Sequence, residues 1–194
     1  MKIVLYNDRL LYRKENSDGG YSKWLSRLSD VGDTIDVITN DHEEERNFKR
    51  DEKEVIAKQP DILVVNAGIN EVWRGYWKND YIQPEEYEKL LVKFLKNVKS
   101  ACADVKIILI EPTISFSADK KHWKRDLEGI IVAVRKAAIQ AGDDLIPFDG
   151  ILAKAVFNAK DKTKYTVNGI ALTEDGERLL AEKIEKSIEL LRNR

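Results

Sequence analysis

Apolar runs without polar alternation recur along the chain, and each is followed by a stretch with helical periodicity. Five of them predict strands, at residues 3–5, 35–38, 62–65, 105–110 and, more weakly, 145–148. Such runs are typical of strands that are buried on both faces. Because they alternate with amphipathic helices, the pattern predicts an α/β fold, a five-stranded parallel sheet between two helical layers.

Two helices are well marked. One begins at Pro84, which suits a first helical turn, and the acidic residues 85–86 favour the positive end of the helix dipole. The last helix begins after Thr173, a plausible cap. Each shows an inward apolar face: Leu90, Leu91, Phe94, Leu95 and Val98 in the first, and Leu179, Leu180, Ile184, Ile188 and Leu191 in the second.

The charge-dense stretch 41–54, DHEEERNFKRDEKE, also predicts a surface helix, since Phe48, Val55 and Ile56 supply inward positions at helical spacing. A binding role for this stretch stays open. No linker rich in Pro, Gly or Ser divides the chain and no repeat is visible, so we expect one domain over residues 1–194.

Composition limits the possible functions. Lys and Arg total 33 against 34 for Asp and Glu, so a net charge of -1 gives no reason to expect nucleic acid or an anionic membrane as a partner. Cys102 is the only cysteine, which excludes an internal disulfide framework and favours a reducing compartment. We expect a soluble, cytoplasmic protein without a cofactor. His42 and His122 show no zinc-ligand spacing, so no metal site is predicted.

In open parallel sheets, ligands bind beyond the carboxyl ends of the strands. Candidate chemistry therefore belongs to the segments that follow each predicted strand: residues 7–9, 40–45, 68–74, 111–117 and the stretch before Thr173.

The third of these segments carries a family pattern. PDILVVNAGINEVWRGYW, at residues 60–77, resembles the third sequence block of the SGNH (GDSL-type) hydrolases, with matches at Gly68, Ile69, Asn70, Glu71, Val72, Trp73 and Arg74. GGYSKWLSRL, YEKLLVKFLKNVK, IILIEP and NGIALTEDGERLLAEKI resemble other parts of the family, so essentially the whole chain is covered.

The resemblance implies a flavodoxin-like strand order of 2-1-3-4-5 and an esterase site. In the family, a Gly-Asp-Ser serine after the first strand attacks the ester. A histidine takes its proton and an aspartate orients that histidine, while a glycine after strand two and the asparagine of block three help to stabilise the oxyanion.

The catalytic positions depart from this pattern. Gly-Asp-Ser corresponds to residues 7–9, so Arg9 stands at the nucleophile position, where a guanidinium cannot attack a carbonyl. The closing block places Asn168 at the orienting aspartate and Ala171 at the histidine. Of the four residues that name the family only Asn70 is kept, with Asp8 and Gly169 as remnants of the scaffold.

A different alignment does not restore the site. His42 and His122 both lie far upstream of the closing block, and no glycine occurs between Gly32 and Gly68. The nearest serine after the first strand is Ser17. We therefore interpret the chain as a scaffold without serine–histidine ester hydrolysis, either a natural pseudoenzyme or a sequence redesigned for folding.

Two other functions stay open. The first is an anion-binding module for a small carboxylate or phosphate, built from Arg9, Asn70, Arg74 and Asn168 with Asp8 nearby. The alternative for Arg9 is an ion pair with one of four acidic residues: Asp8, Glu43, Glu44 or Glu71.

The second is an esterase or carbohydrate acetyl-esterase that acts on an ester-like ligand through other groups near Asn70, Asp8 and His42. A separate and weaker alternative is an aspartyl nucleophile at Asp8, as in phosphatases of similar topology, but no second acidic residue or metal-binding carboxylates accompany Asp8. Four aromatic residues either line an acyl or sugar pocket or close the top of the core: Trp73, Tyr76, Trp77 and Trp123.

Overall fold

The sheet has the predicted size and order. In a computed structural model, which describes residues 1–11, 20–25, 32–40, 46, 48–115, 117 and 119–193, five parallel strands lie in the order β2-β1-β3-β4-β5. The strands are β1 (Lys2–Asp8), β2 (Thr34–Asn40), β3 (Ile62–Asn66), β4 (Lys106–Ile110) and β5 (Asp144–Ile146). The predicted flavodoxin-like α/β architecture is confirmed.

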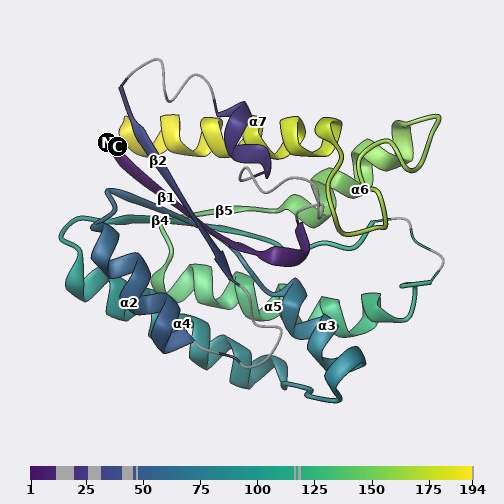
Figure 1. The fold of residues 1–194 in the computed structure, drawn as a ribbon, viewed down its shortest axis with the longest axis horizontal. Helices are drawn as coiled ribbons and strands as arrows, with labels where there is room; N and C mark the ends of the chain where they lie inside the picture. Colours follow the sequence, from purple (N-terminus) through teal and green to yellow (C-terminus); the bar gives the residue numbers. More distant parts are fainter. Residues whose placement is uncertain are drawn as a thin grey trace.

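Helices cover both faces of the sheet (Figure 1). One layer contains α2 (Phe48–Lys58), α3 (Ile69–Lys78), α4 (Pro84–Ala101) and α5 (Trp123–Ala141). The other contains α6 (Phe148–Asn158), α7 (Glu174–Arg192) and the short 3-10 helix η2 (Gly20–Trp24). A second 3-10 turn, η1 (Arg9–Leu11), directly follows β1.

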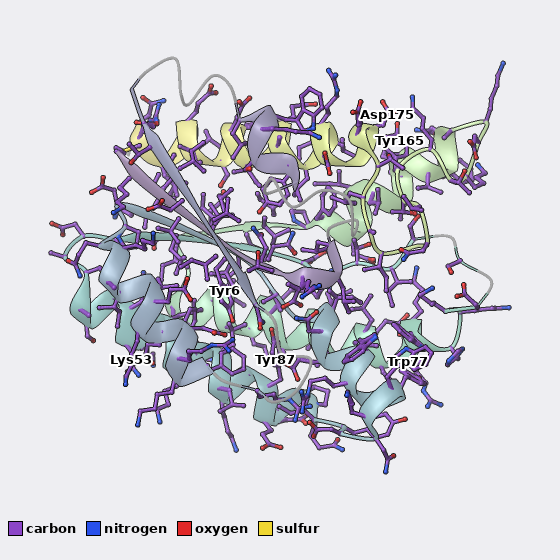
Figure 2. All side chains as sticks on the ribbon, viewed as in Figure 1. Tyr6, Lys53, Trp77, Tyr87, Tyr165 and Asp175 are labelled. Atoms are coloured by element: carbon purple, nitrogen blue, oxygen red, sulfur yellow. The ribbon has the colours of Figure 1, made fainter. Side chains whose placement is uncertain are left out.

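Successive strand residues face opposite layers and divide the core in two. In β1, Val4 and Tyr6 belong to the cluster under α4 and α5, whereas Ile3 and Leu5 pack with α6 and α7. Figure 2 shows Tyr6 and Tyr87 in the first of these layers. The alternation continues at the end of the strand, so Asp8 faces the same layer as Tyr6, the layer that contains α3.

Most predicted strand ends differ by a few residues from the observed ones, and three differences change the assignment of a segment. The fifth strand ends at Ile146 instead of residue 148, because Pro147 has no N–H to donate and serves as the N-cap of α6, which begins at Phe148. Residues 69–74, expected in a loop, form the first part of α3. The predicted helix over 41–54 is observed from Phe48 onward; residues 41–45 and 47 lie outside the described residues.

The helical faces agree with the apolar pattern at most positions. Leu91, Phe94, Leu95 and Val98 of α4 are buried, as are four residues of α7, namely Leu180, Ile184, Ile188 and Leu191. Leu90 and Leu179, which were also expected to point inward, are only partly buried. The side chain of Thr173 accepts a hydrogen bond from the N–H of Gly176, which confirms it as the cap of α7. Within the described part of the chain, no helix combines the length and apolar character needed to cross a membrane.

Candidate functional site at the carboxyl edge of the sheet

Asp8, the last residue of β1, is fully buried and bonded to α3. Its Oδ2 accepts hydrogen bonds from the backbone N–H groups of Gly68, at 2.7 Å, and Asn70, at 3.0 Å. These groups belong to the amino terminus of α3, where N–H donors lack helical partners and the helix dipole favours a negative charge. Gly68, the N-cap residue, offers no side chain. Asp8 therefore caps α3 from the neighbouring strand.

Two asparagines extend this network to β2. Asn40, at the end of β2, donates from its Nδ2 to Asp8 Oδ1 at 2.8 Å, and Asn70 donates from its Nδ2 to the backbone carbonyl of Asn40 at 2.9 Å. Both asparagine side chains are buried. The block-three asparagine of the family pattern therefore ties α3 to β2.

Gly68 is required by its surroundings. Its φ of +130° lies in a region that side-chain-bearing residues rarely adopt, and a Cβ there would lie 2.8 Å from Ile130 Cγ2 and 3.1 Å from Pro112 Cγ. A glycine at this position lets the backbone turn from β3 into α3 while its N–H points at Asp8.

The closing segment before α7 returns to the end of β1. The N–H of Leu172 donates to the carbonyl of Leu11 in η1 at 3.3 Å, and the N–H of Ser115 donates to the carbonyl of Gly169 at 2.7 Å. Position 171 therefore lies next to the turn that begins at Arg9. The two positions that the family pattern assigns to the base and the nucleophile occupy the same edge of the sheet.

The side chains at these positions differ in burial and in hydrogen bonding. Ala171 is buried and ends in a methyl group, whereas Arg9 is exposed at the start of η1. Asn168 is also exposed, and its Oδ1 accepts the N–H groups of Ile170, at 3.0 Å, and Ala171, at 2.9 Å. Asn168, which the resemblance places at the orienting aspartate, thus stabilises its own turn, as asparagine side chains do in Asx-turns.

Arg74 lies one turn beyond Asn70 and pairs with Asp80, which follows the end of α3. Its Nε donates to Asp80 Oδ2 at 2.9 Å. Arg46 donates to Asp80 Oδ1 at 2.7 Å and also pairs with the buried Glu71. Hydrogen bonds from Arg74 and Arg46 lower the pKa of Asp80 below its usual value. Arg46 and Asp80 were not among the residues predicted from the sequence.

The predicted cationic pocket is only partly assembled. Asp8 and Asn70 are joined directly, while Asn168 bonds within the closing segment and Arg74 is engaged with Asp80. The anion-binding role of these residues stays a prediction. His42, Glu43 and Glu44, which the alternatives invoke, lie outside the described residues, as does Ser17. His122, by contrast, is exposed and precedes α5 as its N-cap.

The four positions of the family pattern offer limited chemistry for acyl transfer. None of the residues at positions 8, 9, 168 and 171 bears a hydroxyl, thiol or imidazole group, the groups that serve as nucleophile or base in acyl transfer. Asp8, the remaining carboxylate, accepts three hydrogen bonds in a buried position, a geometry that suits a structural anion rather than a nucleophile. Among the described residues, no group of three or more His, Cys, Asp or Glu side chains could hold a metal ion.

Comparison with solved structures agrees with the fold. A protein from Parabacteroides merdae, named as a GDSL-like lipase, superposes with a TM-score of 0.77 at 20% identity over 93% of this chain and 92% of its own. A hydrolase from the metagenome of Lake Arreo gives a TM-score of 0.76 at 18% identity, with coverages of 94% and 92%.

An acetylxylan esterase from Geobacillus stearothermophilus gives a TM-score of 0.76 at 20% identity, covering 96% of this chain and 93% of that one. No protein-family model matches the chain, and no curated protein is significantly similar to it in sequence. From the strand order, the helices on both faces and these superpositions, the chain has the fold of the SGNH (GDSL-type) hydrolases.

Proposed function

We propose that this protein is a non-catalytic member of the SGNH fold class, a scaffold that lacks serine–histidine ester hydrolysis. The observation that carries the proposal is the pair of substitutions at one edge of the sheet. Arg9 and Ala171 follow β1 and precede α7, where the family pattern requires a nucleophile and a general base. A guanidinium stays protonated and a methyl group carries no proton to exchange, so neither can serve as the nucleophile or the general base of acyl transfer.

The contacts of the two retained positions support the same conclusion. Asp8 and Asn70 bond to backbone groups of α3 and β2, so the polar groups that remain from the family pattern hold the fold together. The proposal applies equally to a natural pseudoenzyme and to a redesigned sequence. The cytoplasmic location also stays a prediction, made from the single cysteine.

An ester assay tests the proposal. We expect the purified protein to hydrolyse 4-nitrophenyl acetate no faster than an equal concentration of an unrelated protein, with no change after treatment with a serine-directed phosphonate. Turnover well above this background that the phosphonate abolishes would contradict the proposal, and it would favour the esterase alternative through groups such as Ser17 and His42.

A restored variant provides the matched comparison. Arg9→Ser, Asn168→Asp and Ala171→His together replace the missing groups at positions that the fold brings to one edge. We expect this triple variant to exceed the unmodified protein by about 10²-fold or more, the lower end of what a positioned general base contributes. Equal rates in the two proteins would contradict the assignment of these three positions.

A further inference from the structure

A second region of the molecule offers an open cavity. It has a volume of about 480 Å³ and lies between α3, the connection from α3 to α4, and the beginnings of α4 and α5. In Figure 1, α3 lies beside α5 in the layer opposite α6 and α7. Volumes of this size are typical of small-molecule sites. The family pattern assigns no role to this cavity.

Two tyrosine rings form its aromatic wall. Tyr76 and Tyr81 both line the cavity, with ring centroids 6.1 Å apart and an interplanar angle of 74°. Tyr76 is fixed in place, because its ring stacks on Trp123 at 5.2 Å and its hydroxyl donates to Asp126 Oδ2 at 2.7 Å. Gly75 provides the seat for Tyr81, since a Cβ at Gly75 would lie 2.6 Å from the Tyr81 ring. Two nearly perpendicular rings are therefore held at the cavity by the packing around them.

The charged residues that line the cavity are Glu71, Arg125 and Asp126. Glu71 is buried and already paired with Arg46. Arg125 extends into solvent, with its side chain 87% exposed, and its Nε lies 3.5 Å from Asp126 Oδ1. An exposed pair of this kind contributes little energy, so a ligand can displace it. Asp126, with its side chain 34% exposed, is the carboxylate within reach of a bound molecule.

The protonated phenol of Tyr76 maintains its hydrogen bond to Asp126 at neutral pH. Burial, together with the hydrogen bond to Asp126, raises the pKa of Tyr76 to about 12. The phenol therefore stays protonated and continues to donate to Asp126 across the physiological range. The remaining walls include Val72, Ile82 and Ile130, which suit alkyl groups.

We propose that this cavity binds a small organic cation, an alkylammonium group seated against the faces of Tyr76 and Tyr81 and paired with the carboxylate of Asp126. The negative face of an aromatic ring attracts a cation within about 6 Å of its centroid. The apolar walls accept the N-alkyl groups, and a small anion in the same place would meet the carboxylate of Asp126. This site is independent of the non-catalytic function proposed above.

A comparison of two ligands of one shape tests the proposal on the unmodified protein. Choline and 3,3-dimethyl-1-butanol differ chiefly in the positive charge, because carbon replaces nitrogen in the second. Titration followed by NMR or calorimetry should show choline binding at least about fivefold more tightly than the neutral alcohol, the smaller effect expected of a partly desolvated cation over aromatic rings. Equal affinity for the two, no binding of choline, or preferential binding of acetate would overturn the proposal.

Variants assign the binding to the named groups. Tyr81→Leu keeps apolar bulk but removes one aromatic face, and Asp126→Asn keeps an acceptor for Tyr76 while removing the charge. We expect each to weaken choline binding at least about threefold, without weakening the neutral alcohol to the same extent. Trp77→Leu is the matched control, because Trp77 is an aromatic residue of α3 that is 69% exposed and does not line the cavity. Its position on the surface is labelled in Figure 2.

The control variant should bind choline as the unmodified protein does. If Tyr81→Leu and Asp126→Asn also retain full affinity while remaining folded by circular dichroism, choline binds elsewhere and the assignment is wrong. If either variant fails to fold, the comparison of choline with its neutral analogue still decides the question, since it uses the unmodified chain.

Discussion

The two ends of α3 use polar residues in opposite ways. At its amino terminus, Asp8 and Asn70 bond to backbone groups and connect α3 to two strands. Toward its carboxyl end, Tyr76 and Tyr81 line an open cavity, with Asp126 also in its wall. In the first region polar side chains bond to backbone groups, whereas in the second they border an open volume. We therefore expect a small ligand to bind at the second region rather than at the first.

The largest expected effect is the difference in stability loss between substitutions at Asp8 and at Arg9. Asp8→Ala leaves three buried donors without their acceptor, so we expect the free energy of unfolding to fall by about 3 kcal/mol or more. Arg9→Ala changes an exposed side chain and should alter it by about 0.5 kcal/mol or less. Urea denaturation measures both.

The same experiment includes an intermediate variant. Asp8→Asn keeps an acceptor oxygen but removes the charge at the amino terminus of α3, so its loss should lie between the other two. Equal losses for Asp8→Ala and Arg9→Ala would show that position 8 is not a structural anchor of α3.

Substituting one glycine in each region extends the comparison of the two ends of α3. Gly68→Ala must hold a positive φ and bring a Cβ to 2.8 Å from Ile130, so we expect a loss of about 2 to 3 kcal/mol in thermal or urea unfolding. Gly75→Ala meets only the ring of Tyr81, which is 57% exposed and can move outward. Its stability should stay within about 1 kcal/mol of the unmodified protein, since alanine favours a helix.

The consequence of Gly75→Ala should appear in binding instead. Displacing Tyr81 removes one ring from the cavity, so choline affinity should fall while stability is kept. A Gly75→Ala protein that binds choline unchanged would show that the seat of Tyr81 does not matter for the ligand.

A further small effect concerns the ion pairs at the end of α3. Asp80→Asn weakens the bonds to Arg74 and Arg46, and because Asp80 is more than a third exposed we expect a loss of only about 1 kcal/mol at pH 7. The folded-state pKa of Asp80 is lowered, so its contribution is complete above the unfolded value of about 3.9 and disappears as the pH falls through the lower folded value.

Unfolding at several pH values measures this. The difference between the Asp80→Asn and unmodified proteins should be constant from pH 7 to about pH 5 and shrink below about pH 4. Glu128→Gln, on the exposed face of α5, is the control and should show no such change. A difference that grows in acid would contradict a lowered pKa for Asp80 in the folded protein.

Much of the fold could be predicted because its signals are local. Continuous apolar runs located all five strands, and helical spacing located the buried faces of α4 and α7. The strand order came from the family resemblance. The helix α3 was missed because its capping group is Asp8, which lies 60 residues before Gly68 and gives no local cap signal. The end of the fifth strand was misplaced because the apolar Phe148 continues the run past Pro147.

The candidate site also combines features that the sequence predicted with contacts that it could not predict. The family resemblance in the sequence predicted Arg9, Asn168 and Ala171 as substituted positions, and this assignment stays a prediction. It gave no indication that Arg74 would pair with Asp80, because the partners of a charged side chain depend on where helix ends and loops meet in space. The sequence left open whether Tyr76 lines a pocket or closes the core, and it gave no signal for Tyr81. In the structure the ring of Tyr81 lies against Gly75, and both tyrosines line the cavity.

Covalent labelling tests the central claim, the absence of an activated nucleophile, most directly. The unmodified protein is incubated with a fluorophosphonate, and its intact mass is measured alongside that of the triple variant with Ser, Asp and His at positions 9, 168 and 171. We predict no adduct on the unmodified protein and one adduct, at position 9, on the variant. A stoichiometric adduct on any serine of the unmodified protein would contradict the claim.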